Sequence, residues 1–318
     1  MKIGVIGECM IELSQQGDHS KIGFGGDTLN TAVYLARLLS NTSHSVHYIS
    51  ALGQDPYSEM MLQAWQNEGI HTELVQQLPQ KLPGLYSIVT DDKGERSFYY
   101  WRNDSAAKYW LETEKSASIL EILKDFDYLY FSGISLAILS ECSRQKLLEF
   151  LPHFKSNGGK VVFDNNYRPV LWRDFAEAQL AYQQILSFTD MAFLTLDDEE
   201  KLWGKETVEE CVKRTQQFGV SEIVIKRGAE SCLVEHGQQF EIPARKIEQV
   251  IDTTAAGDSF SAGYLSARLL GRNEMKAATL AHDVAGCVIC HRGAIIPKEA
   301  FQFVIPYVDD FELRNWNE

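Results

Sequence analysis

The sequence predicts an α/β protein, in which helices cover both faces of a mostly parallel central sheet and a small second β-sheet stands apart. Three observations point to this fold class. Short apolar segments alternate with amphipathic segments of helical length along most of the chain. One aromatic-rich stretch with a period of two residues interrupts that alternation. The 318 residues are 45% hydrophobic, which is enough to bury a large core.

The amino-terminal part reads as strand, helix, strand and helix. Residues 2–7 form a short buried strand, and residues 8–13 are expected to continue it with polar interruptions. After a glycine-rich turn, apolar side chains recur at helical spacing across residues 28–40. Residues 46–52 are β-like. Residues 57–69 then form a helix that ends at a glycine, as helices often do.

A hairpin of a different character follows. Residues 85–90 and 96–102 are rich in Tyr and Phe, and a polar turn at residues 91–94 joins them. We expect this hairpin to belong to a lid rather than to the core. The lid is expected to be discontinuous, formed from about residues 8–24 and 84–103.

From residue 109 onward the alternation resumes, so parallel strands joined through helices are expected. The predicted strands are residues 128–132, 160–164, 191–194 and 222–226, with a hairpin at 231–243. The predicted helices are residues 118–125, 141–157, 176–187, 207–218 and 276–290. No linker or repeat interrupts the pattern, so residues 1–318 are expected to form a single domain. Ligands of such sheets gather at the carboxyl ends of the strands.

Composition excludes several classes of partner. Asp and Glu outnumber Lys and Arg by 44 to 30, which gives a formal net charge of −14. Nucleic acid and anionic membranes would repel such a surface. The first apolar run is too short for a signal sequence, and no stretch reaches the roughly 18 uninterrupted apolar residues of a membrane span. We therefore expect a cytoplasmic protein with no nucleic-acid or membrane partner.

Two small-residue segments at helix starts are candidate binding sites. The first runs from Gly25-Gly26-Asp27 to Asn30. Adjacent glycines let a polyhydroxylated ligand approach the backbone, and Asp27 and Asn30, three residues apart on a helix, present hydroxyl-binding groups on one side. An ordinary loop followed by a helix cap is the alternative explanation.

The second segment is residues 252–265. Its small residues Ala255, Ala256 and Gly257 leave backbone N–H groups open to an anion such as phosphate. Asp258 lies in the first helical turn beside them. We expect it to be ionised there and able to take a proton from an attacking hydroxyl. The alternative is that Asp258 only caps the helix.

Basic residues follow two of the predicted strands. Arg168 can bind a carboxylate or a phosphate bidentately, although an exposed ion pair is the commoner role of an arginine. Lys226 and Gly228 can place an ammonium and an unobstructed N–H near a nucleotide phosphate, or can simply form a turn. On the hairpin, Tyr86 and its neighbours can close over a substrate or form cross-strand and dimer contacts. Both can hold, since alternate residues face opposite sides.

The sequence predicts no metal centre formed by the protein alone. The four acids at residues 197–200 begin a helix, where such runs usually form a solvated face, and we give them at most a water-mediated role near magnesium. Cys287-Val288-Ile289-Cys290-His291 matches a haem attachment motif and half of a zinc site. No second ligand pair lies near it in the sequence, and it reads as part of a buried helix. The histidines show no ligand spacing.

The two small-residue segments resemble the signatures of the ribokinase-like (PfkB) carbohydrate kinases. Residues 252–258 are similar to the late signature Asp-Thr-x-Gly-Ala-Gly-Asp, and residues 25–30 to the first one. Ala255 stands where the signature has glycine, which should be tolerated if its φ is negative. The resemblance implies a three-layer α/β/α fold with a small β-lid. It also implies phosphoryl transfer from ATP to a sugar, with Mg²⁺ bridging the phosphates.

Within that family the chain looks most like the kinases of 2-keto-3-deoxygluconate, a sugar acid. The positions that match their substrate site are Tyr86, Tyr100-Trp101-Arg102 and Asn166-Tyr167-Arg168. An acid substrate needs an arginine, which makes the two arginines the expected specificity residues. Asp258 would be the base on the terminal hydroxyl. The expected anion hole consists of the N–H groups of Ala255, Ala256 and Gly257. ATP would lie along Thr195, Lys226 and Gly228.

Other functions remain open at this point. The runner-up is a kinase for another sugar, such as fructose, tagatose or a nucleoside. A noncatalytic sugar-sensing protein is disfavoured because sensing needs no base at Asp258. A dinucleotide-dependent oxidoreductase lacks its Gly-x-Gly-x-x-Gly turn after the first strand. The resemblance also suggests a homo-oligomer formed through the β-lid.

Overall fold

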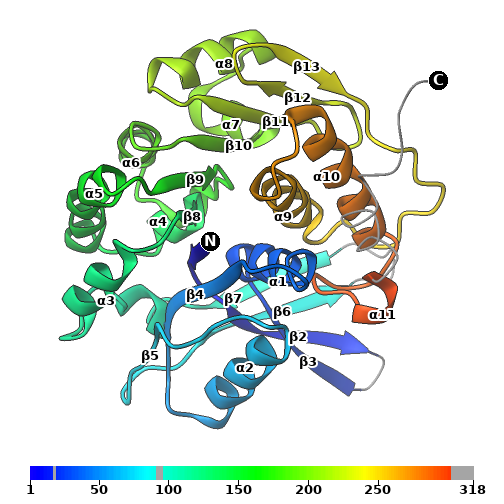
Figure 1. Cartoon of the computed structure of the whole chain (residues 1–318). Coiled ribbons are helices and arrows are strands. Elements are labelled where there is room, and N and C mark those ends of the chain that lie inside the picture. The colour runs from blue at the N-terminus through cyan, green and yellow to red at the C-terminus, as the bar shows by residue number, and fades with distance from the viewer. Residues whose placement is uncertain (17–18, 91–95, 302–318) are drawn as a thin grey trace.

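The computed structural model describes residues 1–16, 19–90 and 96–301. It forms a three-layer α/β/α unit with a smaller sheet beside it (Figure 1). The predicted fold class is therefore confirmed. The expected organisation as one domain of residues 1–318 with a discontinuous lid stays a prediction.

The central sheet has nine strands in the order β13-β12-β11-β10-β9-β8-β1-β4-β5. Neighbours from β11 to β5 run parallel, and β12 and β13 add an antiparallel hairpin at one edge. The strands are β1 Lys2–Ile6, β4 Ser45–Leu52, β5 Val75–Gln77, β8 Tyr128–Ser132, β9 Lys160–Asp164, β10 Met191–Thr195, β11 Glu222–Lys226, β12 Cys232–Glu235 and β13 Gln239–Ile242.

The helices between these strands form the outer layers. They are α1 Asp27–Leu38, α2 Pro56–Asn67, α3 Ser116–Leu123, α4 Gly133–Ala137, α5 Glu141–Ser156, α6 Phe175–Leu186, α7 Leu196–Trp203, α8 Val208–Gln217, α9 Ala256–Leu269, α10 Glu274–Val288 and α11 Lys298–Phe301. In the part of the chain that the structure describes, none of them is long and apolar enough to cross a membrane.

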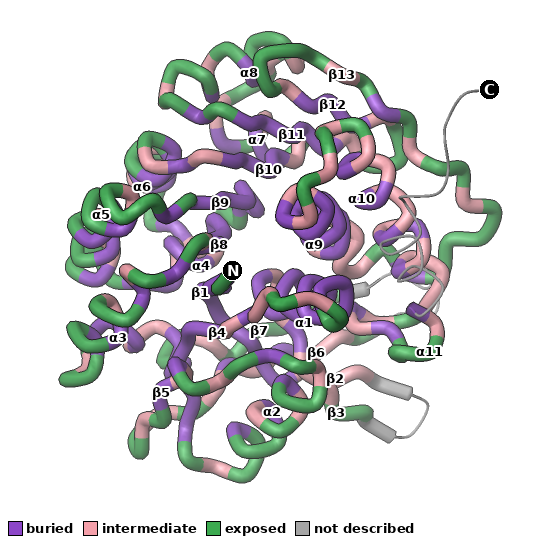
Figure 2. Tube along the Cα trace, in the orientation of Figure 1, coloured by how far each residue is buried: buried purple, intermediate pink, exposed green. Residues whose placement is uncertain are grey.

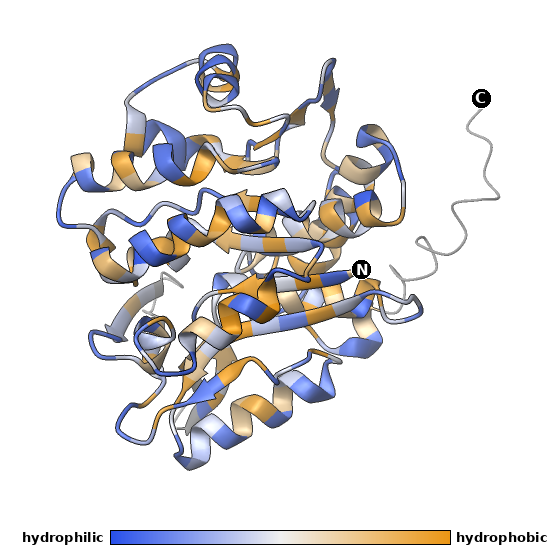
Figure 3. Ribbon diagram, turned by 60° about the vertical axis from the view of Figure 1, so that its left-hand side comes forward, coloured by the Kyte–Doolittle hydropathy of each residue, from blue (hydrophilic) through white to orange (hydrophobic). Residues whose placement is uncertain are grey.

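Two hydrophobic cores lie on the two faces of the sheet, because alternate strand residues point to opposite sides. Val162 and Val224 face the core shared with α1, α2, α9 and α10. Val161 and Ile223 face the core shared with α3, α5, α6 and α8. Apolar residues are concentrated on the strands in Figure 3 and are mixed with polar ones along the helices. Helices α1 and α9 are buried almost throughout (Figure 2).

The second sheet has four strands in the order β3-β2-β6-β7. These are β2 Met10–Gln16, β3 His19–Gly25, β6 Gly84–Thr90 and β7 Arg96–Trp101. β2 and β6 are parallel, and the hairpins β2/β3 and β6/β7 are antiparallel. The predicted aromatic hairpin is therefore present, whereas its predicted turn at residues 91–94 lies outside the described residues. We call this four-stranded sheet the lid sheet.

One strand prediction was wrong. Residues 8–13 do not continue the first strand, because β1 ends at Ile6 and β2 begins at Met10 in the lid sheet. The chain passes tightly over the start of α1 between them, where a side chain at Gly7 would overlap that of Thr28. Polar and apolar residues alternate along β2, as expected for a strand in a sheet with one exposed face. The prediction had instead treated these polar residues as interruptions of a buried strand.

Candidate active site

The carboxyl ends of the parallel strands and the starts of two helices meet at one place. Helix α1 begins at Asp27 and α9 at Ala256, and the two helices pack against each other in the core. The first residues of both helices are partly buried and the residues that follow them are buried, so the polar side chains at these starts are only partly open to water. This brings together the two segments that the sequence analysis singled out.

Asp258 lies at the centre of this arrangement. Its Oδ2 accepts a hydrogen bond of 2.8 Å from Nδ2 of Asn30, and its carbonyl accepts one of 3.3 Å from Oγ1 of Thr31. Burial raises the pKa of Asp258 to about 7, and the negative charges of Asp27 and Asp164 act in the same direction. Sequence reasoning expected a firmly ionised carboxylate at a helix start, so the direction of this shift is a correction.

Asp27 is held on the other side of the site. Its Oδ2 accepts a 2.8 Å hydrogen bond from Nδ2 of Asn166, and burial raises its pKa. Asn166 follows β9 with a φ of 25°, in the sparsely populated region where strain often accompanies a functional site. Asn165 accepts the Asn166 N–H at 2.7 Å and so fixes that turn. Asp27 and Asn30 thus have different partners, Asn166 and Asp258 respectively, and their role in binding hydroxyl groups stays a prediction.

A buried ion pair between Lys226 and Asp164 borders the site. The Lys226 ammonium donates to Oδ2 of Asp164 at 2.7 Å and to Oγ of Ser261 at 3.3 Å. The same Asp164 oxygen also accepts hydrogen bonds from Ser261 at 2.8 Å and from Tyr130 at 3.2 Å. Lys226, predicted to lie along a nucleotide, is therefore neutralised within the protein. Lys226 nevertheless lies close to Gly257 in the first turn of α9. Its Nζ is 3.6 Å from the position that a Cβ on Gly257 would take.

The loop before α9 is fixed by its first aspartate. Oδ1 of Asp252 accepts hydrogen bonds from the N–H and hydroxyl of Thr254 at 3.0 and 2.7 Å, and Oδ2 accepts one of 2.8 Å from the N–H of Gly293. Ala255 then adopts a left-handed conformation with φ 60° and ψ 15°. The condition given for tolerating an alanine here, a negative φ, is therefore not met. The signature position favours glycine because the backbone there is left-handed.

The alanine at position 255 predicts a strain that a glycine would relieve. We expect Ala255→Gly to raise the free energy of unfolding by up to about 1 kcal/mol, because relief of the left-handed penalty exceeds the entropy that glycine adds to the unfolded chain. The matched control is Ala256→Gly, one residue later inside α9. That change should lower stability by roughly 0.5–1 kcal/mol. Urea unfolding of both variants tests this, and equal losses for the two would contradict it.

The N–H groups of Ala256 and Gly257, both part of the proposed anion hole, differ in their hydrogen bonding. The Ala256 N–H donates to the carbonyl of Thr253 at 3.2 Å, which closes the turn before the helix. Gly257 lies in the first turn of α9, where an N–H has no carbonyl of its own helix to bond. With the positive end of the helix dipole, this arrangement can bind an anion beside Asp258.

The two early glycines are explained by close packing. A Cβ at Gly25 would overlap the hydroxyl of Tyr86, and one at Gly26 would overlap the carbonyl of Glu8. We had expected a ligand to approach the backbone at these glycines, whereas the Tyr86 hydroxyl and the Glu8 carbonyl fill the space beside them. Tyr86 donates its hydroxyl to the Glu12 carboxylate, which joins the neighbouring strands β6 and β2 of the lid sheet.

The two predicted specificity arginines have different surroundings. Arg102 is almost buried and pairs through Nη2 with Glu8, whose side chain is only 1% exposed. Arg168 is 48% exposed and donates through Nη1 to Asp198 at 3.1 Å. Despite burial, the negative charges of Asp198, Asp27 and Asp258 raise the pKa of Arg168. A guanidinium carries five N–H groups, so each arginine can bind a further acceptor while keeping its carboxylate.

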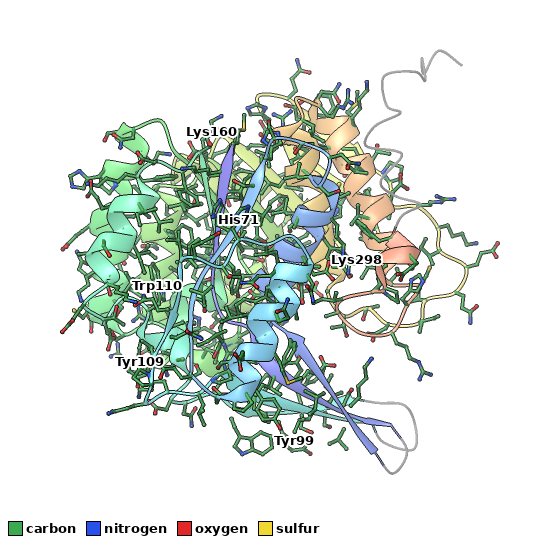
Figure 4. The ribbon with its side chains drawn as sticks, turned by 60° about the horizontal axis from the view of Figure 1, so that its bottom comes forward. His71, Tyr99, Tyr109, Trp110, Lys160 and Lys298 are labelled. Atoms are coloured by element: carbon green, nitrogen blue, oxygen red, sulfur yellow. The ribbon has the colours of Figure 1, made fainter. Side chains whose placement is uncertain are left out.

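Tyr100 lies on the lid sheet opposite Tyr86, with ring centroids 5.9 Å apart. Its side chain therefore shares the Tyr86 face. Tyr99 and Trp101 point to the opposite face, where they are exposed (Figure 4 labels Tyr99). The lid sheet thus presents aromatic side chains on both faces.

The remaining predicted nucleotide residues lie at neighbouring strand ends. Thr195 ends β10, and its N–H donates to Oδ1 of Asn165 at 3.0 Å. Gly228 follows β11 with a φ of 61°, a conformation that favours glycine. The acids 197–200 are not a uniformly solvated face, because Asp198 and Glu199 are buried. Glu199 accepts hydrogen bonds from Asn165 at 2.7 Å and from Arg214 at 2.6 Å.

The cysteine motif near the carboxyl end does not form a metal centre. Cys287 and Cys290 line a surface cleft of about 520 Å³ together with residues of the 245–251 loop. Nδ1 of His291 instead lies 3.0 Å from the carbonyl of Cys287. Among the described residues these three do not converge on a common point.

Sequence reasoning missed several residues of the site. They are Glu8, Glu12, Tyr130, Asp164 and Ser261. Asp164 had a signal, since it is the last residue of a predicted strand and ligands gather at such ends. The others had none, because each acts through a partner distant in the sequence.

Comparison with known proteins agrees with this geometry. The profile of the pfkB family carbohydrate kinases matches residues 2–300. A 2-dehydro-3-deoxygluconokinase of Escherichia coli strain K12 is 59% identical over 303 residues, covering 94% of this chain and 98% of the relative. One of Dickeya dadantii is 57% identical over 302 residues, covering 94% and 97%.

Among solved structures, an Escherichia coli protein described as a ribokinase II, in complex with ATP and Mg²⁺, has the same fold. Its TM-score is 0.80 at 23% identity, and the match covers 96% of this chain and 99% of that one. The family profile spans the chain from β1 to α11 and so covers both the central sheet and the lid sheet. The chain belongs to the pfkB family of carbohydrate kinases.

Proposed function

We propose that this protein is a 2-dehydro-3-deoxygluconokinase, which transfers the γ-phosphoryl group of ATP to the C6 hydroxyl of 2-keto-3-deoxygluconate and gives 2-keto-3-deoxy-6-phosphogluconate. The observation that carries the proposal is Asp258, a carboxyl with a pKa of about 7 at the start of a buried helix. A group with that pKa is ionised often enough at neutral pH to accept a proton, and basic enough to hold it. The full-length relatives of 57% and 59% identity bear the same activity in their names.

In the proposed mechanism, Asp258 accepts the proton of the terminal hydroxyl as that oxygen attacks the phosphoryl group. Asn30 orients the carboxylate through its 2.8 Å hydrogen bond. The N–H groups of Ala255, Ala256 and Gly257 stabilise the charge on the transferring phosphoryl oxygens. Ala256 exchanges its bond to Thr253 for the phosphoryl oxygen.

The polar residues around this point suit a sugar and a nucleotide. Asp27, Asn166 and the lid-sheet face of Tyr86 and Tyr100 offer donors and acceptors for hydroxyl groups. The nucleotide would lie along Thr195, Lys226 and Gly228. When bound, Mg²⁺ neutralises charge on the phosphates. Asp164 and Asp258 provide the oxygen donors that it prefers and would hold it through water.

The direct test measures ADP release on a panel of sugars with and without Mg²⁺. The panel contains 2-keto-3-deoxygluconate, fructose, tagatose and a nucleoside. We expect Mg²⁺-dependent release that is fastest with the keto acid. Faster turnover of a neutral sugar would refute the assigned acceptor and would leave the family intact.

Specificity for the acid should reside in Arg168. We expect Arg168→Lys to lower kcat/KM for the keto acid by about 10-fold or more, because lysine cannot bind a carboxylate bidentately. Turnover of a neutral sugar should change little. Asp198 keeps a cationic partner in this variant through Lys201, at 3.1 Å, so a general loss of folding is not expected. An equal loss for both substrates would contradict the carboxylate role.

The pH dependence of kcat/KM should report Asp258. Because the carboxylate form is the base, activity should fall as the pH drops through about 7. Asp27 raises that pKa by its negative charge, so Asp27→Asn should move the midpoint to lower pH in whatever activity remains. Stopped-flow or coupled assays from pH 5 to 9 measure the profile. A midpoint that stays in place would mean that another group titrates.

We further propose that two copies associate through the outer face of the lid sheet. Ile22, Val89, Tyr99 and Trp101 are exposed there by 42%, 39%, 53% and 62%. A contiguous apolar face of this kind typically marks an interaction site. Light scattering of Trp101→Glu against the unmodified protein tests the proposal. The expected cytoplasmic location stays a prediction.

A further inference from the structure

Two histidines and a glutamate meet at the end of the sheet that lies away from the candidate active site. His47 is the third residue of β4, and His71 and Glu73 lie on the segment that leads into β5. Their potential ligand atoms all lie within 4.8 Å of one another. We infer that His47, His71 and Glu73 form a binding site for a divalent transition cation of the Zn²⁺ type.

The backbone brings these side chains together. His47 and His71 form a parallel bridge, in which the Tyr48 N–H donates to the His71 carbonyl at 2.9 Å and the His71 N–H to the Val46 carbonyl at 2.8 Å. Residues paired in this way point to the same side of a sheet. Glu73 lies two residues later in a turn, which the Val75 N–H closes by donating to the Thr72 carbonyl at 3.0 Å. The two histidines are therefore placed by paired backbone, and Glu73 by a hydrogen-bonded turn.

Two separations between ligand atoms are close to those of tetrahedral coordination. Nδ1 of His71 lies 3.1 Å from Oε1 of Glu73, and Nδ1 of His47 lies 3.8 Å from Oε2. Ligands about 2.0–2.1 Å from a tetrahedral zinc ion are about 3.4 Å from one another. The observed separations lie on either side of that value. Small side-chain rotations would complete the set and leave a fourth position for water.

A further contact orients the first histidine for this role. Nε2 of His47 lies 3.0 Å from the hydroxyl of Ser45. In the tautomer whose Nε2 donates this hydrogen bond, Nδ1 is the lone-pair nitrogen, and the second nitrogen of a ligating histidine usually has such a partner. The imidazole of His71 stacks on that of His47 at 4.4 Å, and the Phe126 ring packs edge-on against His47 at 4.9 Å. Both contacts restrict rotation of His47.

The donor set selects the class of cation. Two imidazoles with one carboxylate suit zinc and its neighbours, whereas Mg²⁺ prefers oxygen ligands alone. The protein's net charge of −14 favours any cation. The other comparable group among the described residues, Glu199, Glu206 and Cys211, already has its carboxylates bound by Arg214 at 2.6 and 2.5 Å. It offers a cation no free carboxylate.

The site is remote from phosphoryl transfer. His47 lies toward the amino end of β4, whereas the candidate active site lies at the carboxyl ends of the strands. In Figure 4, His71 lies far from Tyr99 on the lid sheet. The expected effect of the cation is to tie the segment before β5 to β4. Variants at this site should therefore keep kinase activity.

The test uses the full protein, stripped of metal and free of nucleotide. Calorimetric titration with ZnCl₂ should show one site whose affinity falls at least about 10-fold in His71→Ala and in Glu73→Gln. Both side chains are partly exposed, at 46% and 67%, so both variants should fold. The Tm should rise with zinc concentration in the unmodified protein and less in these variants. MgCl₂ at the same concentrations should have no such effect.

The matched control is His236→Ala, since His236 forms an exposed pair with Glu274 at 2.8 Å without a second histidine beside it. This variant should bind zinc as the unmodified protein does. Anomalous scattering at the zinc edge from a soaked crystal should place the ion between His47, His71 and Glu73. Equal zinc affinity in all variants, an ion elsewhere, or no binding would each overturn the inference.

Discussion

Replacing Asp258 with asparagine should lower kcat by about 10²–10⁴-fold, since the variant loses the base that accepts the hydroxyl proton. The amide is close in size and can still pair with Asn30, so binding of the sugar acid should remain measurable. Steady-state ADP release, with calorimetry of the keto acid, separates the two effects.

Stability provides the control for that variant. Folding raises the pKa of Asp258 from its ordinary value of 3.8 to about 7, so the folded state binds the extra proton between those values. Stability therefore decreases as the pH rises through this range, and above about pH 7 the charged carboxylate disfavours folding. Asp258→Asn removes this effect and should be at least as stable as the unmodified protein at pH 8. Near-normal turnover in a folded variant would rule out Asp258 as the base.

Replacing Lys226 with methionine should have the second largest effect. It removes the cation from Asp164, whose side chain is 5% exposed, and leaves a buried carboxylate with only hydroxyl donors. Breaking a buried pair from one side costs roughly 3–5 kcal/mol of unfolding free energy. Because Lys226 also lowers the pKa of Asp258, the midpoint of the kcat/KM profile should move to higher pH. Thermal unfolding and the pH profile measure the two consequences.

The double variant Asp164→Asn, Lys226→Met distinguishes a charge effect from a loss of packing. It removes both members of the pair, and Ser261 and Tyr130 can still bond the new amide. We expect it to recover much of the stability that Lys226→Met loses. If the double variant were no more stable than the single one, the buried charge would not be the cause.

Periodicity and signature residues predicted the main strands, the long helices and the aromatic hairpin. They could do so because strand and helix patterns are local, and a buried parallel strand such as 160–164 stands out as an apolar run. The continuation of the first strand through residues 8–13 failed for the opposite reason. Whether a polar-alternating segment joins one sheet or another depends on its pairing partners, which for β2 are β3 and β6.

The candidate site divides in the same way. Asp258, Asp27 and Asn30 could be named because their types and positions at helix starts are visible in the sequence. The ion pair of Lys226 with Asp164 and that of Arg102 with Glu8 could not, since each joins different elements. The left-handed backbone of Ala255 was likewise hidden, because an alanine at that position gives no sign of a positive φ.

The sequence by itself determined the α/β fold class, the lid hairpin and the carboxylate expected to act as the base. The tertiary structure decided which of these groups are charged and which are near one another. The pKa of Asp258 depends on burial and on Asp27 from another helix, so no local pattern can report it. His47, His71 and Glu73 likewise show no ligand spacing in the sequence and meet only because β4 pairs with the segment before β5. Electrostatic and coordination effects act through space, which the order of residues alone does not specify.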